Sequence, residues 1–121
     1  MIKLTNWNVK FVGTSGKEYQ FDLYSFVDFN DVKGAFDPEA ALYVFGKLTE
    51  DQTLFSRIYM GETDNLHARF SNHHKETCIR EHAANSIGIC KNDDFEEETK
   101  RLAAEKDILE ANNFPCNDAN N

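Results

Sequence analysis

Two short apolar runs separated by a polar segment constrain the fold of this chain more than any other feature. They read ALYVFGKL at residues 41–48 and LFSRIYMG at residues 54–61. Both have the aromatic and branched composition of β-strands, so we expect them to pair as a hairpin. The run SIGIC at residues 86–90 is expected to add a third strand to the same sheet.

Helices are expected on either side of this third strand. Thr63 and Asp64 are residue types that cap helices, and the next segment places Leu66 and Phe70 four residues apart on one face. We therefore expect a helix to begin here, and CIREHAA at residues 78–84 to continue or restart it.

The C-terminal part of the chain predicts a long amphipathic helix, DFEEETKRLAAEKDILEANN at residues 94–113. Phe95, Leu102 and Leu109 recur every seven residues there and would form its buried stripe. From residue 41 onward the expected order is strand, strand, helix, strand, helix. The predicted fold class is α+β, with a three-stranded antiparallel sheet flanked by helices.

The first forty residues predict an additional N-terminal β-hairpin. WNVKFV at residues 7–12 and EYQFDLY at residues 18–24 flank the turn GTSGK. We expect residues 1–40 to pack on a core domain of residues 41–117, where they cover one edge of the sheet or form a dimer surface. Residues 118–121 are expected to be a flexible tail.

Composition bounds the class of protein. Forty per cent of the residues are hydrophobic, with ten Phe and only two Pro, which predicts a folded globular chain. No apolar run could span a bilayer, and MIKLTNWNVK lacks the core of a signal peptide, so we expect a soluble cytoplasmic protein without a membrane partner. Cys78, Cys90 and Cys116 form no CxxC pair, and we expect three reduced thiols.

The net charge of −8 disfavours tight binding to plain duplex DNA, because nucleic-acid binding usually depends on a basic face. The charge is uneven along the chain. Residues 57–91 carry five Lys and Arg against four acidic residues, whereas residues 92–121 carry three against nine. The middle segment also holds every histidine, namely His67, His73, His74 and His82. A positively charged functional surface is therefore expected only in the middle segment.

Polar side chains follow the expected elements in an order that resembles the GIY-YIG nuclease superfamily. Ala41-Leu42-Tyr43 stands in place of the first motif and Tyr59-Met60-Gly61 in place of the second. The resemblance covers residues 41–117. It implies a metal-dependent endonuclease that hydrolyses phosphodiester bonds in nucleic acid, with DNA favoured over RNA.

The resemblance also implies roles for residues beyond the two motifs. Arg69 and His73 match the spacing of the family's helix arginine and the histidine or tyrosine after it, and His82 stands where homing endonucleases of this family carry a further histidine. Glu105 matches the metal-binding glutamate, and Asn117 within PCN matches the closing asparagine. The implied cofactor is Mg²⁺ or Mn²⁺. A protein partner that delivers the substrate is a further expectation.

These residue types can perform the chemistry together. Tyr43 and Tyr59 would lie side by side in a hairpin, where each phenol can accept or relay a proton. Arg69 supplies a planar cation for phosphate, and His73 four residues later would share its helix face. Glu105 could hold one Mg²⁺, which typically keeps several waters and takes further ligands from phosphate.

Departures from the family pattern keep a second function open. The first motif lacks its glycine and isoleucine, and Glu62 stands where some family members carry a lysine that would favour a phenolate. The alternative is a catalytically weak or inactive relative that serves as a binding or interaction module for a basic protein. The oligomeric state stays open.

Each candidate residue taken alone also fits an ordinary structural role. A tyrosine at a strand end usually packs, and single arginines or glutamates usually lie on solvated helix faces. The four histidines with Cys78 or Cys90 match no usual zinc-ligand spacing. Only the joint order of the residues favours a catalytic site.

Overall fold

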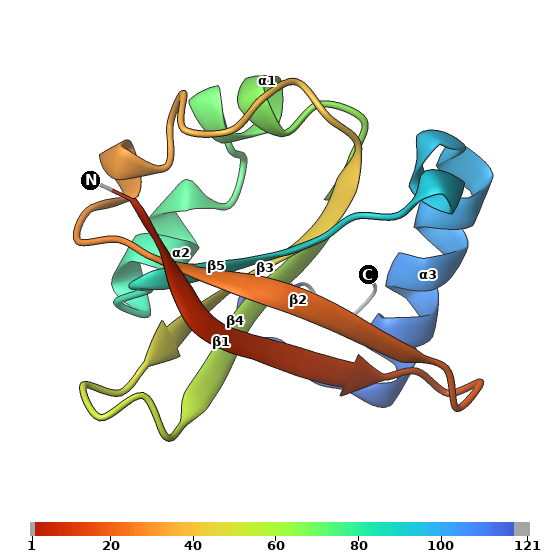
Figure 1. Cartoon of the computed structure of the whole chain (residues 1–121), viewed down its shortest axis with the longest axis horizontal. Helices are drawn as coiled ribbons and strands as arrows, with labels where there is room; N and C mark the ends of the chain where they lie inside the picture. The colour runs from red at the N-terminus through yellow and green to blue at the C-terminus, as the bar shows by residue number, and fades with distance from the viewer. Residues whose placement is uncertain (1, 118–121) are drawn as a thin grey trace.

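The computed structural model of the chain describes residues 2–117, so the expected tail at 118–121 lies outside the described residues. Five strands form one antiparallel sheet in the spatial order β1-β2-β5-β3-β4 (Figure 1). The strands are β1 (Lys3–Val12), β2 (Glu18–Ser25), β3 (Ala41–Leu48), β4 (Phe55–Thr63) and β5 (Ser86–Cys90). The α+β class and the strands near 41–48, 54–61 and 86–90 are confirmed.

The hairpin of β3 and β4 has a register that depends on a glycine. Tyr43 lies opposite Gly61, and a bulge between Phe45 and Gly46 shifts the pairing further along. A Cβ atom at Gly61 would lie 2.6 Å from Tyr43 Oη, so only a residue without a side chain leaves room for the tyrosine ring. The register thereby fixes where the Tyr43 hydroxyl lies.

The N-terminal hairpin continues the sheet, because β2 pairs antiparallel with β5. Its turn is tied to the C-terminal helix α3 (Glu98–Ala111) through Asp107. The Asp107 carboxylate accepts hydrogen bonds from Thr14 Oγ1 at 2.9 Å, Ser15 N at 2.9 Å and Tyr19 Oη at 2.8 Å. These bonds hold α3 against the far end of the hairpin.

Helices cover both faces of the sheet (Figure 1). On one face, the short helices α1 (Leu66–Ser71) and α2 (Glu76–Glu81) and the 3₁₀ turn η1 (Phe29–Asp31) pack over Tyr43 and Phe45. On the other face, α3 and the 3₁₀ turn η2 (Asp93–Glu96) pack over residues of β3 and β5. The two hydrophobic cores lie on opposite faces of the sheet, and alternate residues of β3 contribute to each.

The helix after β4 is shorter than the sequence predicts. Asn65 caps α1 by accepting a hydrogen bond from Ala68 N at 2.9 Å, but the helix ends at Ser71 because Asn72 adopts a non-helical conformation. His73 therefore lies in the turn between α1 and α2. The expected helix face shared by Arg69 and His73 is wrong.

The predicted buried stripe of the C-terminal helix is also wrong. Leu102 is 43% exposed, and the buried residues of α3 are Arg101, Ala104 and Ile108. Phe95 is buried but belongs to η2, and the extended backbone at Glu97 separates that turn from α3. A seven-residue period cannot continue through such a break, because the helical phase restarts after it.

The expectation of three reduced thiols is wrong, because Cys78 and Cys116 form a disulfide, whereas Cys90 is free and buried. The two bonded residues are 38 positions apart in the sequence, and only the fold brings them together.

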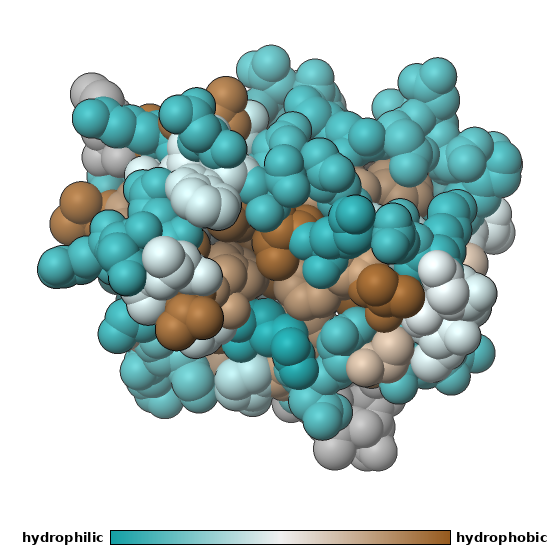
Figure 2. Space-filling view, turned by 60° about the horizontal axis from the view of Figure 1, so that its bottom comes forward, coloured by the Kyte–Doolittle hydropathy of each residue, from teal (hydrophilic) through white to brown (hydrophobic). Residues whose placement is uncertain are grey.

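The face of the sheet that carries α3 is only partly covered. Figure 2 shows hydrophobic side chains inside a hollow with a hydrophilic rim. A hollow between β1 and the β3–β4 turn is lined by residues that include Trp7, Val9, Leu48 and Leu54. Within residues 2–117, none of the helices has the length and apolar character that crossing a membrane requires.

Candidate active site

The two candidate tyrosines meet on the α1 side of the sheet, near its β4 edge. Tyr43 points from β3 and Tyr59 from β4, with their ring centroids 6.1 Å apart. Tyr43 is 0% exposed and Tyr59 is 5% exposed. Tyr59 is therefore the tyrosine nearer to solvent.

His73 contacts Tyr43 directly and has a defined protonation state. Burial, together with the charges of His74 and Arg69, lowers the pKa of His73 to about 3, so its ring is neutral at physiological pH. Its Nδ1 accepts a hydrogen bond from Lys75 N at 3.0 Å, and its Nε2 lies 2.7 Å from Tyr43 Oη. Because a neutral imidazole has one donor and one acceptor, Nε2 carries the proton and donates it to the Tyr43 oxygen.

The proton on Tyr43 is consequently free to be donated elsewhere. Burial raises the pKa of Tyr43 well above its ordinary value, and the neighbouring Tyr59 adds to this shift. Burial also raises the pKa of Tyr59 to about 12, although the charge of Arg69 and a hydrogen bond with Tyr43 act against the shift. Both phenols therefore keep their protons at physiological pH.

Arg69 is the cation of this cluster. It projects from α1, is half-buried, and donates from one terminal nitrogen to the backbone oxygen of Glu62 at 3.2 Å. Its charge favours the ionised form of both Tyr43 and Tyr59. A guanidinium in this position can also face an anion that approaches Tyr59.

Two carboxylates affect the charge of this cluster, namely Glu62 on β4 and Glu105 on α3. Arg101 joins these elements, with its Nε 3.0 Å from Glu62 Oε1 and its NH1 donating to Phe95 O at 2.8 Å. Glu105 lies one helical turn after Arg101 and is half-buried. Burial and then the charge of Glu62 raise the pKa of Glu105 to about 7.

Glu105 offers one carboxylate to the divalent cation that we expect from the sequence. Burial and the neighbouring Glu62 outweigh the opposing charge of Arg69 and keep the pKa of Glu105 raised, and a bound cation would favour its ionised form. Among residues 2–117, the one group of three or more close His, Cys, Asp or Glu donors is Cys78, His82 and Cys116. A cation at Glu105 would accordingly take most of its ligands from water and substrate.

Asn117 lies beside the cluster but has a structural task. Its side-chain amide accepts from Met60 N at 2.9 Å and donates to Met60 O at 2.9 Å. Both bonds satisfy the open backbone of the edge strand β4 at the residue after Tyr59. Asn117 therefore positions Tyr59 and does not present a free reactive group.

His82 belongs to a different group of side chains. It follows α2, and its described hydrogen-bond contacts join its Nδ1 to Cys78 and Cys116. Among the described contacts, none links His82 to either tyrosine.

The structure adds His74 and Arg101 to the residues that the sequence singled out. His74 is exposed, stacks on His73 with ring centroids 5.0 Å apart, and meets the Tyr59 ring edge-on at 6.0 Å. The pair His73-His74 was a visible signal, but a continuous helix would have turned the second ring away. Nothing in the sequence marks Arg101 as a site residue, because it lies in a segment of many charged residues.

Comparisons with known proteins found no match: no family model, no curated protein and no solved structure matches the chain.

Proposed function

We propose that the protein is a metal-dependent endonuclease that hydrolyses phosphodiester bonds, with DNA as the favoured substrate. The observation that carries this proposal is that Tyr43, Tyr59, Arg69 and His73 meet near the β4 edge of the sheet, where the charge of Glu105 also acts on both tyrosines. These residues come from β3, β4, α1, the following turn and α3. Packing alone would not require a phenol pair, a cation and a carboxylate to meet there.

The order of elements supports the resemblance to GIY-YIG nucleases. From residue 41 the chain runs β3, β4, α1 and α2, β5, α3, which is the expected order of strand, strand, helix, strand, helix. The residues in place of the two motifs pair directly, since Tyr43 lies opposite Gly61. A glycine is required at position 61 for a physical reason, because a side chain there would overlap the Tyr43 ring.

The geometry suggests how the side chains would share the work. Arg69 would bind a phosphate oxygen and offset the charge that grows on it during hydrolysis. Tyr59, as the tyrosine nearer to solvent, would exchange a proton with the reacting oxygen, while the hydrogen bond with His73 holds the Tyr43 hydroxyl in place beside it. Mg²⁺ or Mn²⁺ at Glu105 would lower the pKa of bound water and neutralise phosphate charge.

A second candidate function is supported by the burial of Tyr43 and by the charge of the chain. An interaction module without catalysis would tolerate a fully buried Tyr43, and a net charge of −8 suits a basic protein partner better than a polyanion. The endonuclease proposal places the reacting groups at Tyr59, Arg69 and Glu105, which requires no exposure of Tyr43.

The test is cleavage of duplex, branched and single-stranded DNA and RNA at low salt, with Mg²⁺, Mn²⁺ or a chelator. The proposal expects metal-dependent cutting of at least one DNA substrate, because weak binding to plain duplex favours structured or delivered sites. If the folded protein cuts no substrate but binds basic proteins, the interaction module is correct.

A further inference from the structure

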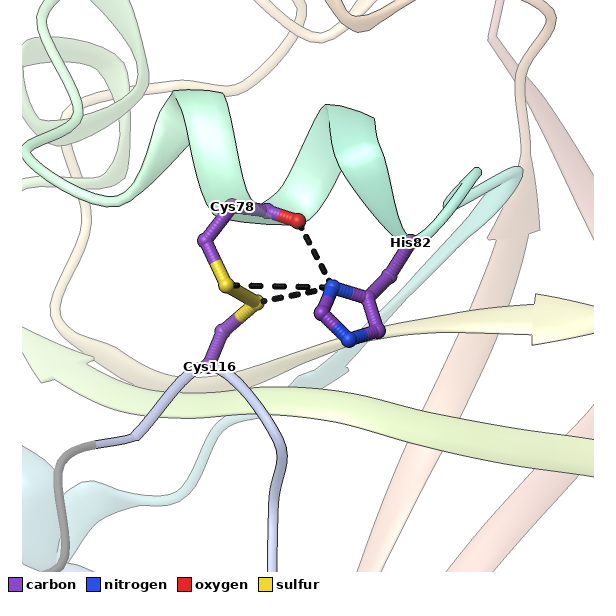
Figure 3. A group of neighbouring side chains, drawn as sticks. All are labelled: Cys78, His82 and Cys116. Carbon is purple, nitrogen blue, oxygen red and sulfur yellow. Dashed lines mark hydrogen bonds between the residues drawn. A yellow bond between two sulfur atoms is a disulfide. The ribbon is translucent and has the colours of Figure 1, made fainter.

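A second group of reactive side chains lies at the C-terminal end of α2, apart from the tyrosines. Cys78 belongs to α2, His82 follows its last turn, and Cys116 comes from the C-terminal segment (Figure 3). His82 Nδ1 lies 3.8 Å from Cys78 Sγ and 3.5 Å from Cys116 Sγ. All three potential ligand atoms lie within 4.8 Å of one another.

We propose that the reduced forms of Cys78 and Cys116 bind a zinc ion together with His82. Two thiolates and an imidazole nitrogen form a donor set that Zn²⁺ prefers over the hard cations Mg²⁺ and Ca²⁺. Cys78 and His82 are four residues apart, so one turn of α2 presents both on the same side. The sequence pattern did not show this site because the third ligand is 34 residues beyond His82.

Two of the three distances between the ligand atoms match a tetrahedral zinc site. With Zn–S near 2.3 Å and Zn–N near 2.0 Å, tetrahedral geometry requires about 3.6 Å between the nitrogen and each sulfur. The observed distances of 3.8 and 3.5 Å from His82 Nδ1 to the two sulfurs already satisfy that requirement. Only the sulfur pair has to separate, to about 3.8 Å.

Reduction opens the site in a balanced exchange. A small dithiol transfers two electrons and two protons to the Cys78–Cys116 bond, leaving two protein thiols and becoming a cyclic disulfide itself. Zn²⁺ then replaces the two thiol protons, which pass to solvent. In the disulfide form, His82 Nδ1 lies 3.0 Å from Cys78 O and donates a hydrogen bond to it. When the metal binds Nδ1, this proton moves to the other ring nitrogen.

The zinc ion would preserve the connection that the disulfide makes. Cys116 precedes Asn117, whose amide bonds to Met60 next to Tyr59. Either cross-link thus holds the C-terminal segment against α2 and β4. His82 is exposed and Cys78 is half-buried, so solvent reaches the fourth coordination position. The zinc site does not depend on the endonuclease proposal, and its test involves no cleavage.

The experiment is a titration of the full chain with Co²⁺ as a spectroscopic stand-in for zinc. The protein is reduced with a phosphine, freed of it without air, and compared with the oxidised protein. Variants Cys78→Ser, Cys116→Ser and His82→Ala are measured beside His67→Ala, which removes an exposed histidine of α1, and Cys90→Ser, which removes the free cysteine. Circular dichroism checks the fold of each.

The expected result is one Co²⁺ per reduced chain, with a thiolate-to-cobalt charge-transfer band and the visible bands of tetrahedral cobalt. The oxidised protein and both ligand-cysteine variants lack these bands, and His82→Ala binds at least about tenfold more weakly. The control variants His67→Ala and Cys90→Ser bind Co²⁺ as tightly as the native chain does. Absence of the charge-transfer band in the reduced native protein overturns the proposal, as does unchanged binding by His82→Ala.

A second readout avoids cysteine variants that fold poorly. Stoichiometric Zn²⁺ should protect Cys78 and Cys116 of the reduced native chain from alkylation, as mass spectrometry of their peptides reports. His82→Ala should lose most of this protection. Equal alkylation of the two cysteines with and without Zn²⁺ would contradict the proposal even if a ligand-cysteine variant were unfolded.

Discussion

Tyr43 Oη accepts a hydrogen bond from His73 Nε2–H, with 2.7 Å between the two heavy atoms. The proton is on Nε2 because Nδ1 of the same ring accepts a hydrogen bond from the backbone N–H of Lys75. The Tyr43 hydroxyl consequently does not donate its own proton to His73. The hydrogen bond also makes His73 a positioning residue, since its ring is buried behind Tyr43 and neutral at physiological pH.

We expect Tyr43→Phe to destabilise the fold. The substitution leaves the buried Nε2–H of His73 without its acceptor, which costs about 1–3 kcal/mol in the free energy of unfolding. Urea denaturation measures the loss, and Tyr24→Phe on a half-buried ring of β2 serves as the control. An equal effect of the two substitutions would show that the bond to His73 adds no stability.

We expect Glu105→Gln to stabilise the metal-free protein at pH 8 but not at pH 4.5. The folded-state pKa of about 7 exceeds the ordinary 4.5, so the stability linked to the protonated group is complete below 4.5 and is lost as the pH rises through 7. After allowance for partial exposure, the gain at pH 8 is about 1–2 kcal/mol.

The measurement is thermal unfolding across this pH range with a chelator present. Glu110→Gln, an exposed carboxylate of the same helix, is the control. A stability difference between Glu105→Gln and the native chain that does not change with pH would show that the pKa of Glu105 is not raised.

We expect Gly61→Ala to destabilise the chain by about 1–3 kcal/mol, because the added methyl group overlaps the Tyr43 ring. Ser56→Ala, at an exposed position of β4, should have little effect. Chemical denaturation of both variants tests this. Full stability of Gly61→Ala would mean that the tyrosine can move without cost.

We expect reduction of the Cys78–Cys116 disulfide in the presence of a chelator to lower the free energy of unfolding by about 4 kcal/mol. The bond closes a loop of 38 residues, and its loss returns that conformational freedom to the unfolded chain. Denaturation of the oxidised and reduced protein gives the difference, and the Cys78→Ser/Cys116→Ser double variant should match the reduced form. Equal stability of all three would contradict this.

The sequence predicted the elements whose signal is local. The strands β3, β4 and β5 follow from aromatic and branched runs between polar segments, and α1 begins near residues that favour caps. The sequence did not predict the end of α1, because Asn72 carries only a weak stop signal. It also missed the break at Glu97, which invalidated the stripe through Leu102.

The site was less predictable than the strands, because it depends on contacts between distant segments. Tyr43 with Tyr59 could be paired from the hairpin alone, and the structure brings them together. The ion pair of Arg101 with Glu62 and the bond between Cys78 and Cys116 join segments 38 or more residues apart. No local pattern encodes such pairs, so the sequence alone does not predict that His82 lies with the two cysteines.

Cleavage by matched variants tests the central claim most directly. The DNA substrate that the native chain cuts best is incubated with Mg²⁺ or Mn²⁺ and with Arg69→Gln, Glu105→Gln and two controls, Lys47→Gln and Glu110→Gln at exposed positions. The account predicts that both site variants, still folded, lose cleavage by at least about a hundredfold and that the controls retain it. Equal cleavage by all five proteins, or no cleavage by the native chain on any substrate, would contradict it.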